Sequence, residues 1–158
     1  MISSRAVDPE THPRCVRVER TIAAPAAHVW QVLVDFARYP EWNPFTYGVE
    51  VTREIGGPVT LHVALGGKKL TMHERLTRWD EGRAVAWGVR WGGGLLLDCD
   101  RVQSLEPINE TTTRYRGHEA FDGLLAPLVI ALYRRPLEEG FAAAADALAR
   151  RAELTYAG

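Results

Sequence analysis

The feature that most constrains the fold is a change in hydrophobic periodicity, which occurs twice along the chain. Residues 46–122 alternate apolar and polar positions, and Gly56-Gly57, Gly66-Gly67 and Gly92-Gly93-Gly94 interrupt the alternation. A period of two between glycine turns is typical of antiparallel strands joined by short connections. Residues 25–36 and 125–155 instead repeat apolar side chains every three or four residues, as amphipathic helices do. With the alternating stretch 15–22, the order is one strand, two short helices, six strands and one long helix.

This order predicts an α+β fold in which the C-terminal helix covers one face of a curved antiparallel sheet, because it is the only long element available. A single helix fills only part of a concave face, so we expect a cavity between helix and sheet. Pro136 interrupts the helical pattern and predicts a bend or break there. The expected apolar stripe takes a five-residue step beside this proline and consists of Leu128, Leu132, Leu137, Phe141, Ala144, Leu148 and Ala152.

The connection DFARYPEWNPF, residues 35–45, is unusually aromatic for a segment between a helix and a strand. Asp35 can cap a short second helix that Pro40 stops. Two interpretations remain open for Tyr39, Trp42 and Phe45: they complete the core, or they line and close one end of the cavity.

Several polar residues share the strand parity of apolar neighbours, and alternate residues of a strand point to one face. Glu74 shares its parity with Met72 and Leu76, and Glu119 lies between Tyr115 and Phe121. Arg101 and Gln103 belong to the row of Leu97, Cys99 and Leu105. Across the hairpin at residues 107–110, Arg101 falls opposite Gly117 or Glu119. Charges buried in this way need partners, which are either one another with water or the polar end of a ligand.

Composition excludes several classes of function. The formal net charge is -1, and the arginines are scattered among acids, so neither nucleic acid nor an anionic membrane is indicated. Cys15 and Cys99 form no CxxC spacing, and no histidine pair has helical ligand spacing, so we expect no metal site. Because nothing indicates a disulfide framework, we expect the protein to be located in the reducing cytoplasm. The polar N-terminus is unlike a signal peptide, and no apolar run is long enough for stable membrane insertion. We expect a flexible tail over residues 1–12 and a single domain over residues 13–158.

The stretch APAAHVWQVLVDFARYPEWNPF resembles the opening of START-like, or SRPBCC, proteins, and is most similar to their polyketide cyclase/dehydrase-type members. AVAWGVRW, SLEP, TTTRYRGHEAFDGLLAP and ADALARRAE resemble later parts of the same family, so the similarity spans about residues 14–154. The resemblance implies a helix-grip fold with an internal apolar pocket. It does not fix the function, because this fold serves carriers, receptors and enzymes.

Two functions remain in competition. We favour a binding or carrier protein for a small hydrophobic molecule that is lipid-like, polyketide-like or aromatic. The alternative is a cofactor-free cyclase or dehydratase in which Glu119 or Glu74 carries a proton with help from Tyr115. No motif identifies a protein partner. The residues expected to bind the ligand are Trp42, Phe45, Met72, Glu74, Trp87, Trp91, Arg101, Gln103, Tyr115, Glu119, Phe121, Leu128, Leu132 and Phe141.

Overall fold

A computed structural model describes residues 8–156. The strands are β1 (Cys15–Ile22), β2 (Thr46–Val51), β3 (Pro58–Leu65), β4 (Lys68–Asp80), β5 (Ala84–Trp91), β6 (Leu97–Asn109) and β7 (Thr112–Asp122). The helices are α1 (Ala26–Val34), α2 (Tyr39–Trp42) and α3 (Ala126–Tyr156), with the short 3-10 helices η1 (Phe36–Arg38) and η2 (Gly92–Gly94). The predicted order of elements is confirmed.

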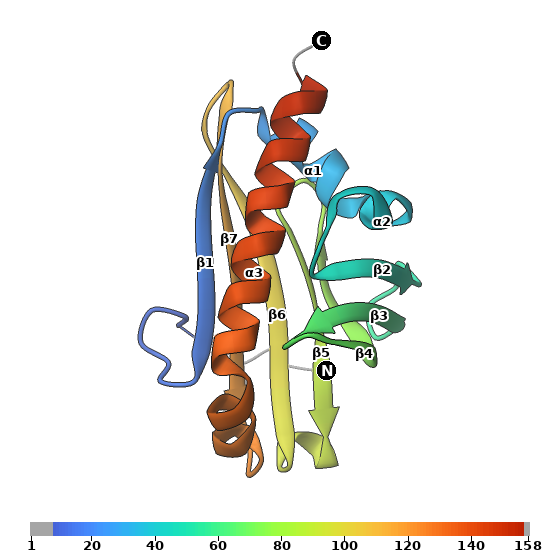
Figure 1. Cartoon of the computed structure of the whole chain (residues 1–158), viewed down its shortest axis with the longest axis vertical. Coiled ribbons are helices and arrows are strands. Elements are labelled where there is room, and N and C mark those ends of the chain that lie inside the picture. The colour runs from blue at the N-terminus through green and yellow to red at the C-terminus, as the bar shows by residue number, and fades with distance from the viewer. Residues whose placement is uncertain (1–7, 157–158) are drawn as a thin grey trace.

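The strands form one antiparallel sheet in the order β1-β7-β6-β5-β4-β3-β2. Every neighbouring pair except β1 and β7 is consecutive in sequence, so short turns build most of the sheet. Figure 1 shows α3 running along the side of the curved sheet that carries β1, β7 and β6, while β2, β3 and β4 curve away from it. This arrangement of one long helix against a curled sheet is the expected helix-grip fold.

The helices after β1 differ in two details from the expectation. Pro25 is the N-cap residue of α1 and stands just before its first turn. Pro40 does not stop the second helix, because it occupies the first turn of the separate helix α2, where its missing N–H needs no partner. Asp35 precedes η1 without making a side-chain capping hydrogen bond.

The C-terminal helix is buried along only part of the predicted stripe. Leu137, Phe141 and Leu148 are in the core, but Leu128 and Leu132 are 57% and 60% exposed. The expectation that one stripe is buried along the whole helix is therefore wrong for these two leucines. A helix turns about 100° per residue, so the five-residue step from Leu132 to Leu137 displaces Leu132 by about 140°. The helix also continues through Pro136 without a break.

The aromatic connection packs against the top of the sheet and against α3. Phe36 and Tyr39 are buried, and the Tyr39 hydroxyl donates to the Leu33 carbonyl at 2.6 Å. Phe45 is also buried and contacts the ring of Phe141 on α3 edge-to-face, with 5.7 Å between centroids. Trp42 packs against the same core while partly exposed. These contacts support the core interpretation of the segment, and they do not test a ligand-lining role.

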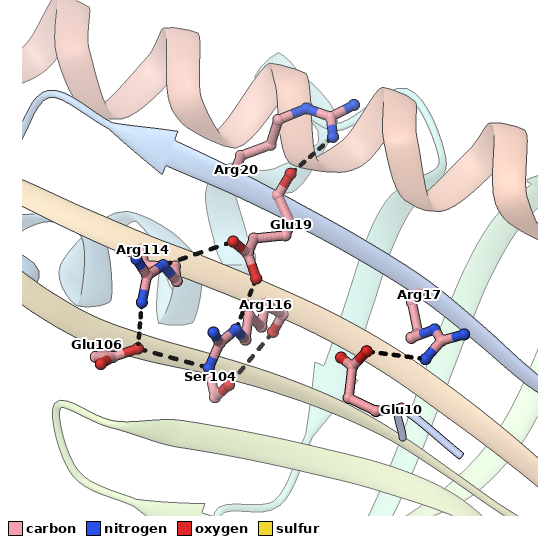
Figure 2. Close-up of polar contacts among 8 residues, drawn as sticks. All are labelled: Glu10, Arg17, Glu19, Arg20, Ser104, Glu106, Arg114 and Arg116. Atoms are coloured by element: carbon pink, nitrogen blue, oxygen red, sulfur yellow. Dashed lines mark hydrogen bonds and ion pairs between the residues drawn. The ribbon is translucent and has the colours of Figure 1, made fainter. Parts of the chain in front are cut away.

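The outer face of β1, β6 and β7 carries arginines that are engaged by acids (Figure 2). The Nε of Arg116 lies 2.7 Å from Glu19, and Arg114 Nη1 lies 3.1 Å from Glu106. Arg17, which lies on β1 like Glu19, pairs with Glu10 at 3.2 Å. These pairs are largely exposed, so solvent screens them and they contribute little to the stability of the fold. Their mixture of charges leaves no basic patch on this part of the surface.

The N-terminal segment is described only from residue 8. His12 Nε2 lies 3.2 Å from the carboxylate of Asp122, and Arg17 Nη1 donates to the Pro9 carbonyl. Residues 8–12 thus follow the surface of β1 and β7. The rest of the predicted tail lies outside the described residues.

Candidate functional site

A row of cross-strand neighbours on the concave face holds the most unusual side chains in the protein. In order across the sheet, the paired residues are Leu76, Trp87, Arg101, Glu119 and Val16. Arg101 stands directly opposite Glu119, which is one of the two partners predicted from the hairpin register. Glu74 lies two residues before Leu76 on the same face of β4. Three strands, β4, β6 and β7, therefore bring one cation and two carboxyl groups together.

These charged groups are buried. The exposed fractions are 5% for Arg101, 7% for Glu74 and 8% for Glu119. The predicted strand parity is therefore correct for all three. Few ionisable side chains are buried to this degree without a partner. The contacts of Arg101, Glu74 and Glu119 therefore decide what this site can bind.

Arg101 is held by two aromatic rings and by one hydroxyl group. Its guanidinium carbon lies 4.4 Å from the ring centroid of Phe141 and 5.3 Å from that of Phe45. Cation–π attraction at such distances is worth about 1–2 kcal/mol in a desolvated site. Its Nη1 donates to Thr46 Oγ1 at 3.3 Å. Within residues 8–156, no ion pair of 4.0 Å or less joins Arg101 to Glu74 or Glu119.

Both carboxyl groups hold their protons more tightly than an exposed carboxyl does. Burial, together with the neighbouring Glu119 charge, raises the pKa of Glu74 to about 8, although Arg101 opposes the rise. Burial likewise raises the pKa of Glu119 to about 7, against the lowering effect of Arg101. One guanidinium therefore faces two carboxyl groups that cannot both ionise at low cost. The pair can share a proton near neutral pH.

Gln103 and Tyr115 extend the cluster of Arg101, Glu74 and Glu119 toward the aromatic segment at residues 35–45. The Tyr115 hydroxyl donates to Gln103 Oε1 at 2.9 Å, and both side chains are buried. Burial raises the pKa of Tyr115, so its phenol stays protonated at neutral pH. Gln103 lies two residues after Arg101, so its place on the same face is also as predicted.

Three buried polar atoms of this region have no hydrogen-bond partner among the described residues: Glu74 Oε2, Trp87 Nε1 and Arg101 Nε. Each such atom costs about 1–3 kcal/mol when nothing replaces its water. They belong to side chains on three consecutive strands, β4, β5 and β6, and on one face of the sheet. A polar group supplied from outside the chain would satisfy them.

The remaining predicted site residues divide into a buried set and an exposed set. Trp87, Phe121, Phe45 and Phe141 are buried around the charges. Met72, Trp91, Leu128 and Leu132 are exposed by 38% to 60%, because α3 packs mainly on β1 and β7 and leaves the ends of β4 and β5 uncovered. The expectation that these four lie within a closed pocket is not met. Whether they contact a ligand stays a prediction.

The exposed set forms part of a larger set of exposed apolar side chains at the end of the concave face where α3 begins. Hydrogen bonds from the amides of Leu124 and Leu125 to the carbonyls of Leu95 and Leu96 bring the connection before α3 against the connection after β5. All four leucines are exposed. On β4, Leu70 and Met72 have the parity of Glu74 and are also exposed. We call Leu70, Met72, Trp91, Leu95, Leu96, Leu124, Leu125, Leu128 and Leu132 the apolar rim.

A surface hollow of about 310 Å³ lies between α3 and the hairpin that joins β3 to β4. Its walls include Phe45, Gly66, Pro136 and Gly140. Since Phe45 also covers Arg101, its ring stands between this hollow and the polar group. A second hollow, of about 260 Å³, lies near Glu10 and Arg17 on the outer face, away from the charges. The expected internal cavity stays a prediction.

Sequence reasoning missed two residues that shape the site. Thr46 is buried and binds Arg101, although 55 residues separate them in sequence. Asn43 is buried and its Oδ1 accepts from the amides of Phe45 and Thr46, which fixes the chain where it enters β2. The Asn-Pro pair at 43–44 is a turn signal that could have indicated Asn43. No local pattern could have indicated that Thr46 contacts Arg101.

Other kinds of site find little support in the described part of the chain. No three His, Cys, Asp or Glu side chains of residues 8–156 come together as metal ligands do. Cys15 and Cys99 are both free and buried, and burial raises the pKa of each thiol, which keeps it in the unreactive protonated form. Over the same residues, no helix has the length and apolar character that crossing a membrane requires.

The fold is similar to several solved structures. The Zhui aromatase/cyclase from a Streptomyces species has 24% identity and a TM-score of 0.70, covering 88% of this chain and 93% of its own. A START superfamily protein from Mycobacterium smegmatis has 21% identity and a TM-score of 0.69, covering 89% and 98%. The di-domain ARO/CYC protein BexL has 17% identity and a TM-score of 0.70, covering 91% of this chain and 48% of its own. At these identities the similarity establishes the START-like helix-grip fold alone.

No curated protein matches the sequence. A family model does match, and it covers residues 13–153, nearly all of the chain. That model describes polyketide cyclases and dehydrases together with lipid transport proteins. The resemblance of the aromatic opening segment and the observed fold agree with this match. The chain therefore belongs to the polyketide cyclase / dehydrase and lipid transport family.

Proposed function

We propose that this protein binds and carries a small hydrophobic molecule along the concave face of its sheet. The polar end of the molecule would lie at Arg101, Glu74 and Glu119, and its apolar part would extend toward the apolar rim. The observation that carries the proposal is the composition of one face of β4, which is buried and ionisable at Glu74 but exposed and apolar at Met72 and Leu70. A ligand with one polar end and an apolar body matches that gradient.

The apolar rim supports the same proposal from the helix side. Exposed apolar surface gathered in one place marks a site of interaction more often than scattered side chains do. Leu128 and Leu132 lie on α3, and Met72 lies on β4, so both walls of the groove contribute. Covering a leucine that is now exposed would contribute about 1–2 kcal/mol of binding free energy.

Native mass spectrometry of the purified protein, followed by solvent extraction, tests the proposal. We expect a bound small molecule that recurs between preparations, or, in protein that purifies empty, saturable binding of the neutral fluorescent probe N-phenylnaphthylamine. Protein that purifies empty and shows no saturable binding of the probe would contradict the proposed carrier function.

A second function, a cofactor-free cyclase or dehydratase, is favoured by one specific observation. The pKa values of Glu74 and Glu119, raised to about 8 and about 7, suit groups that donate and accept protons near neutral pH. The extracted molecule distinguishes the two functions when it is returned to the protein. Conversion that Glu119→Gln abolishes and Tyr115→Phe weakens would establish catalysis, whereas recovery of the unchanged molecule would support the carrier.

A further inference from the structure

The buried charge cluster contains hydrogen-bond donors that have no acceptor. Trp87 Nε1 and Arg101 Nε are N–H donors, and neither has an acceptor within the described residues. The two side chains are direct cross-strand neighbours on the concave face. The third unmet atom, Glu74 Oε2, belongs to a carboxyl that gains one O–H donor when it is protonated. A fourth unmet atom, Thr77 Oγ1, lies near Asp100 and belongs to a separate environment.

The charges around these donors are unequal in number. Arg101 on β6 is the one cation of the cluster, and it faces the carboxyls of Glu74 on β4 and Glu119 on β7. The other titratable groups close to the cluster are the thiol of Cys99, the phenols of Tyr39 and Tyr115, and Asp100 on the same strand. The side chain that α3 contributes here, Phe141, is uncharged.

A neutral cluster therefore needs one proton on the two carboxyls, since a buried site of low dielectric strongly opposes a net charge. With that proton in place, the cluster offers two unmet N–H donors and one carboxyl hydroxyl. Each of these donors calls for an oxygen acceptor on a ligand.

We propose that the cluster selects ligands whose polar end is an uncharged oxygen acceptor, such as a ketone or a phenol, and rejects the carboxylate of the same skeleton. The inference rests on the proposed function, and it deepens that function by naming the charge of the group that is bound. A carboxylate would bring a third acidic group to one guanidinium, so either a net negative charge is buried or another proton is taken up. Both alternatives weaken binding, whereas a ketone oxygen accepts from Trp87 and Arg101 and leaves the charge balance unchanged.

Competition between two matched compounds tests this selection. Acetylnaphthalene and naphthoate of the same substitution pattern differ mainly in the charge of the polar group, and each is titrated against protein that holds N-phenylnaphthylamine. At about pH 7.5 we expect the ketone to displace the probe at concentrations at least about tenfold lower than the carboxylate. The variant Glu74→Gln/Glu119→Gln leaves Arg101 uncompensated, so naphthoate should become the stronger competitor. Glu110→Gln, on the exposed turn between β6 and β7, is the matched control and should keep the wild-type order.

The possible outcomes test the charge selection and the proposed function separately. Equal or stronger displacement by naphthoate from the wild-type protein would overturn the charge selection and leave the proposed function standing. The same order of competitors in the Glu74→Gln/Glu119→Gln variant and in the wild type would also overturn it, because the two carboxyls would then have no part in the choice. Failure of N-phenylnaphthylamine to bind any form of the protein that purifies empty would instead overturn the proposed function, and this inference with it.

Discussion

Arg101 is the residue on which the site depends, because it is the one cation that offsets two buried carboxyl groups. Its position is fixed from two sides, by the rings of Phe45 and Phe141 and by the hydroxyl of Thr46. Its Nε remains free to donate. A side chain held in place in this way can bind a ligand without first being ordered, which lowers the entropic cost of binding.

The raised pKa of Glu74 predicts how stability changes with pH. The ordinary value is 4.5 and the folded value is about 8, so the folded protein keeps a proton that the unfolded chain releases. The stabilisation is fully present below about pH 4.5 and is lost as the pH rises to about 8. Glu74→Gln should therefore reduce the fall in the free energy of unfolding between these pH values, as measured by urea denaturation. The prediction fails if Glu74→Gln retains the full fall of the wild type.

At this scale the sequence predicted which residues share a face but not how they contact one another. Strand parity placed Glu74, Arg101 and Glu119 inward, because alternation along a strand is a local property. The distance between Arg101 and the carboxyls depends on side-chain packing against Phe45 and Phe141, which come from distant parts of the chain. Local patterns contain no information about such contacts.

Among the elements, α3 has two halves with different surroundings. The half after Pro136 buries Leu137, Phe141 and Leu148, and the half before it exposes Leu128 and Leu132. The two halves should accordingly respond differently to substitution, although both sit on one continuous helix.

Phe141→Ala should cost about 3–5 kcal/mol of stability, because it leaves a cavity in the core. Leu132→Ser should change the free energy of unfolding by no more than about 0.5 kcal/mol, since its side chain is exposed. Leu132→Ser should nevertheless weaken the binding of N-phenylnaphthylamine by about fivefold, through the loss of apolar contact. Leu154→Ser, which is 78% exposed in the last turns of α3, is the control and should alter neither quantity. Unchanged probe affinity in Leu132→Ser would show that the apolar rim takes no part in binding.

Gly140 allows α3 to approach the segment before β2. A Cβ atom at this position would collide with the ring of Phe45. Gly140→Ala should therefore destabilise the protein, even though alanine favours a helix over glycine by about 1 kcal/mol. In a Phe45→Ala background, where the ring is absent, the same substitution should be neutral or stabilising. Equal effects in the two backgrounds, measured by thermal unfolding, would show that the ring does not limit this contact.

The order and type of the elements were predictable because periods of 2 and 3.6 are strong signals over long segments. The burial of α3 was predicted less well, because the five-residue step at Pro136 moves the preceding leucines to another face. The role of Pro40 was also misjudged, since a proline fits the start of a helix as well as the end of one. Only the surrounding structure decides between these two roles.

At the scale of the whole molecule, the groove differs at its two ends. The aromatic segment at residues 36–45 covers one end, and the apolar rim leaves the other end exposed. The buried charges lie between them, on the central strands β4 to β7. Under the proposed function, a ligand would approach over the apolar rim and stop with its polar end at the buried charges.

The most direct test of this account combines stability and binding in Arg101→Leu, Glu119→Leu and the variant that carries both substitutions. Arg101→Leu leaves two buried carboxyl groups without their cation and should cost on the order of 3 kcal/mol, whereas the double variant, which leaves a single buried carboxyl, should recover part of that loss. In the recovered double variant, N-phenylnaphthylamine should still bind, because the groove remains apolar. The affinity for acetylnaphthalene should fall by at least about tenfold, because its oxygen has lost the polar end of the site. Small and additive effects on stability, with unchanged affinity for acetylnaphthalene, would contradict the account and show that Arg101 and Glu119 do not form the ligand site.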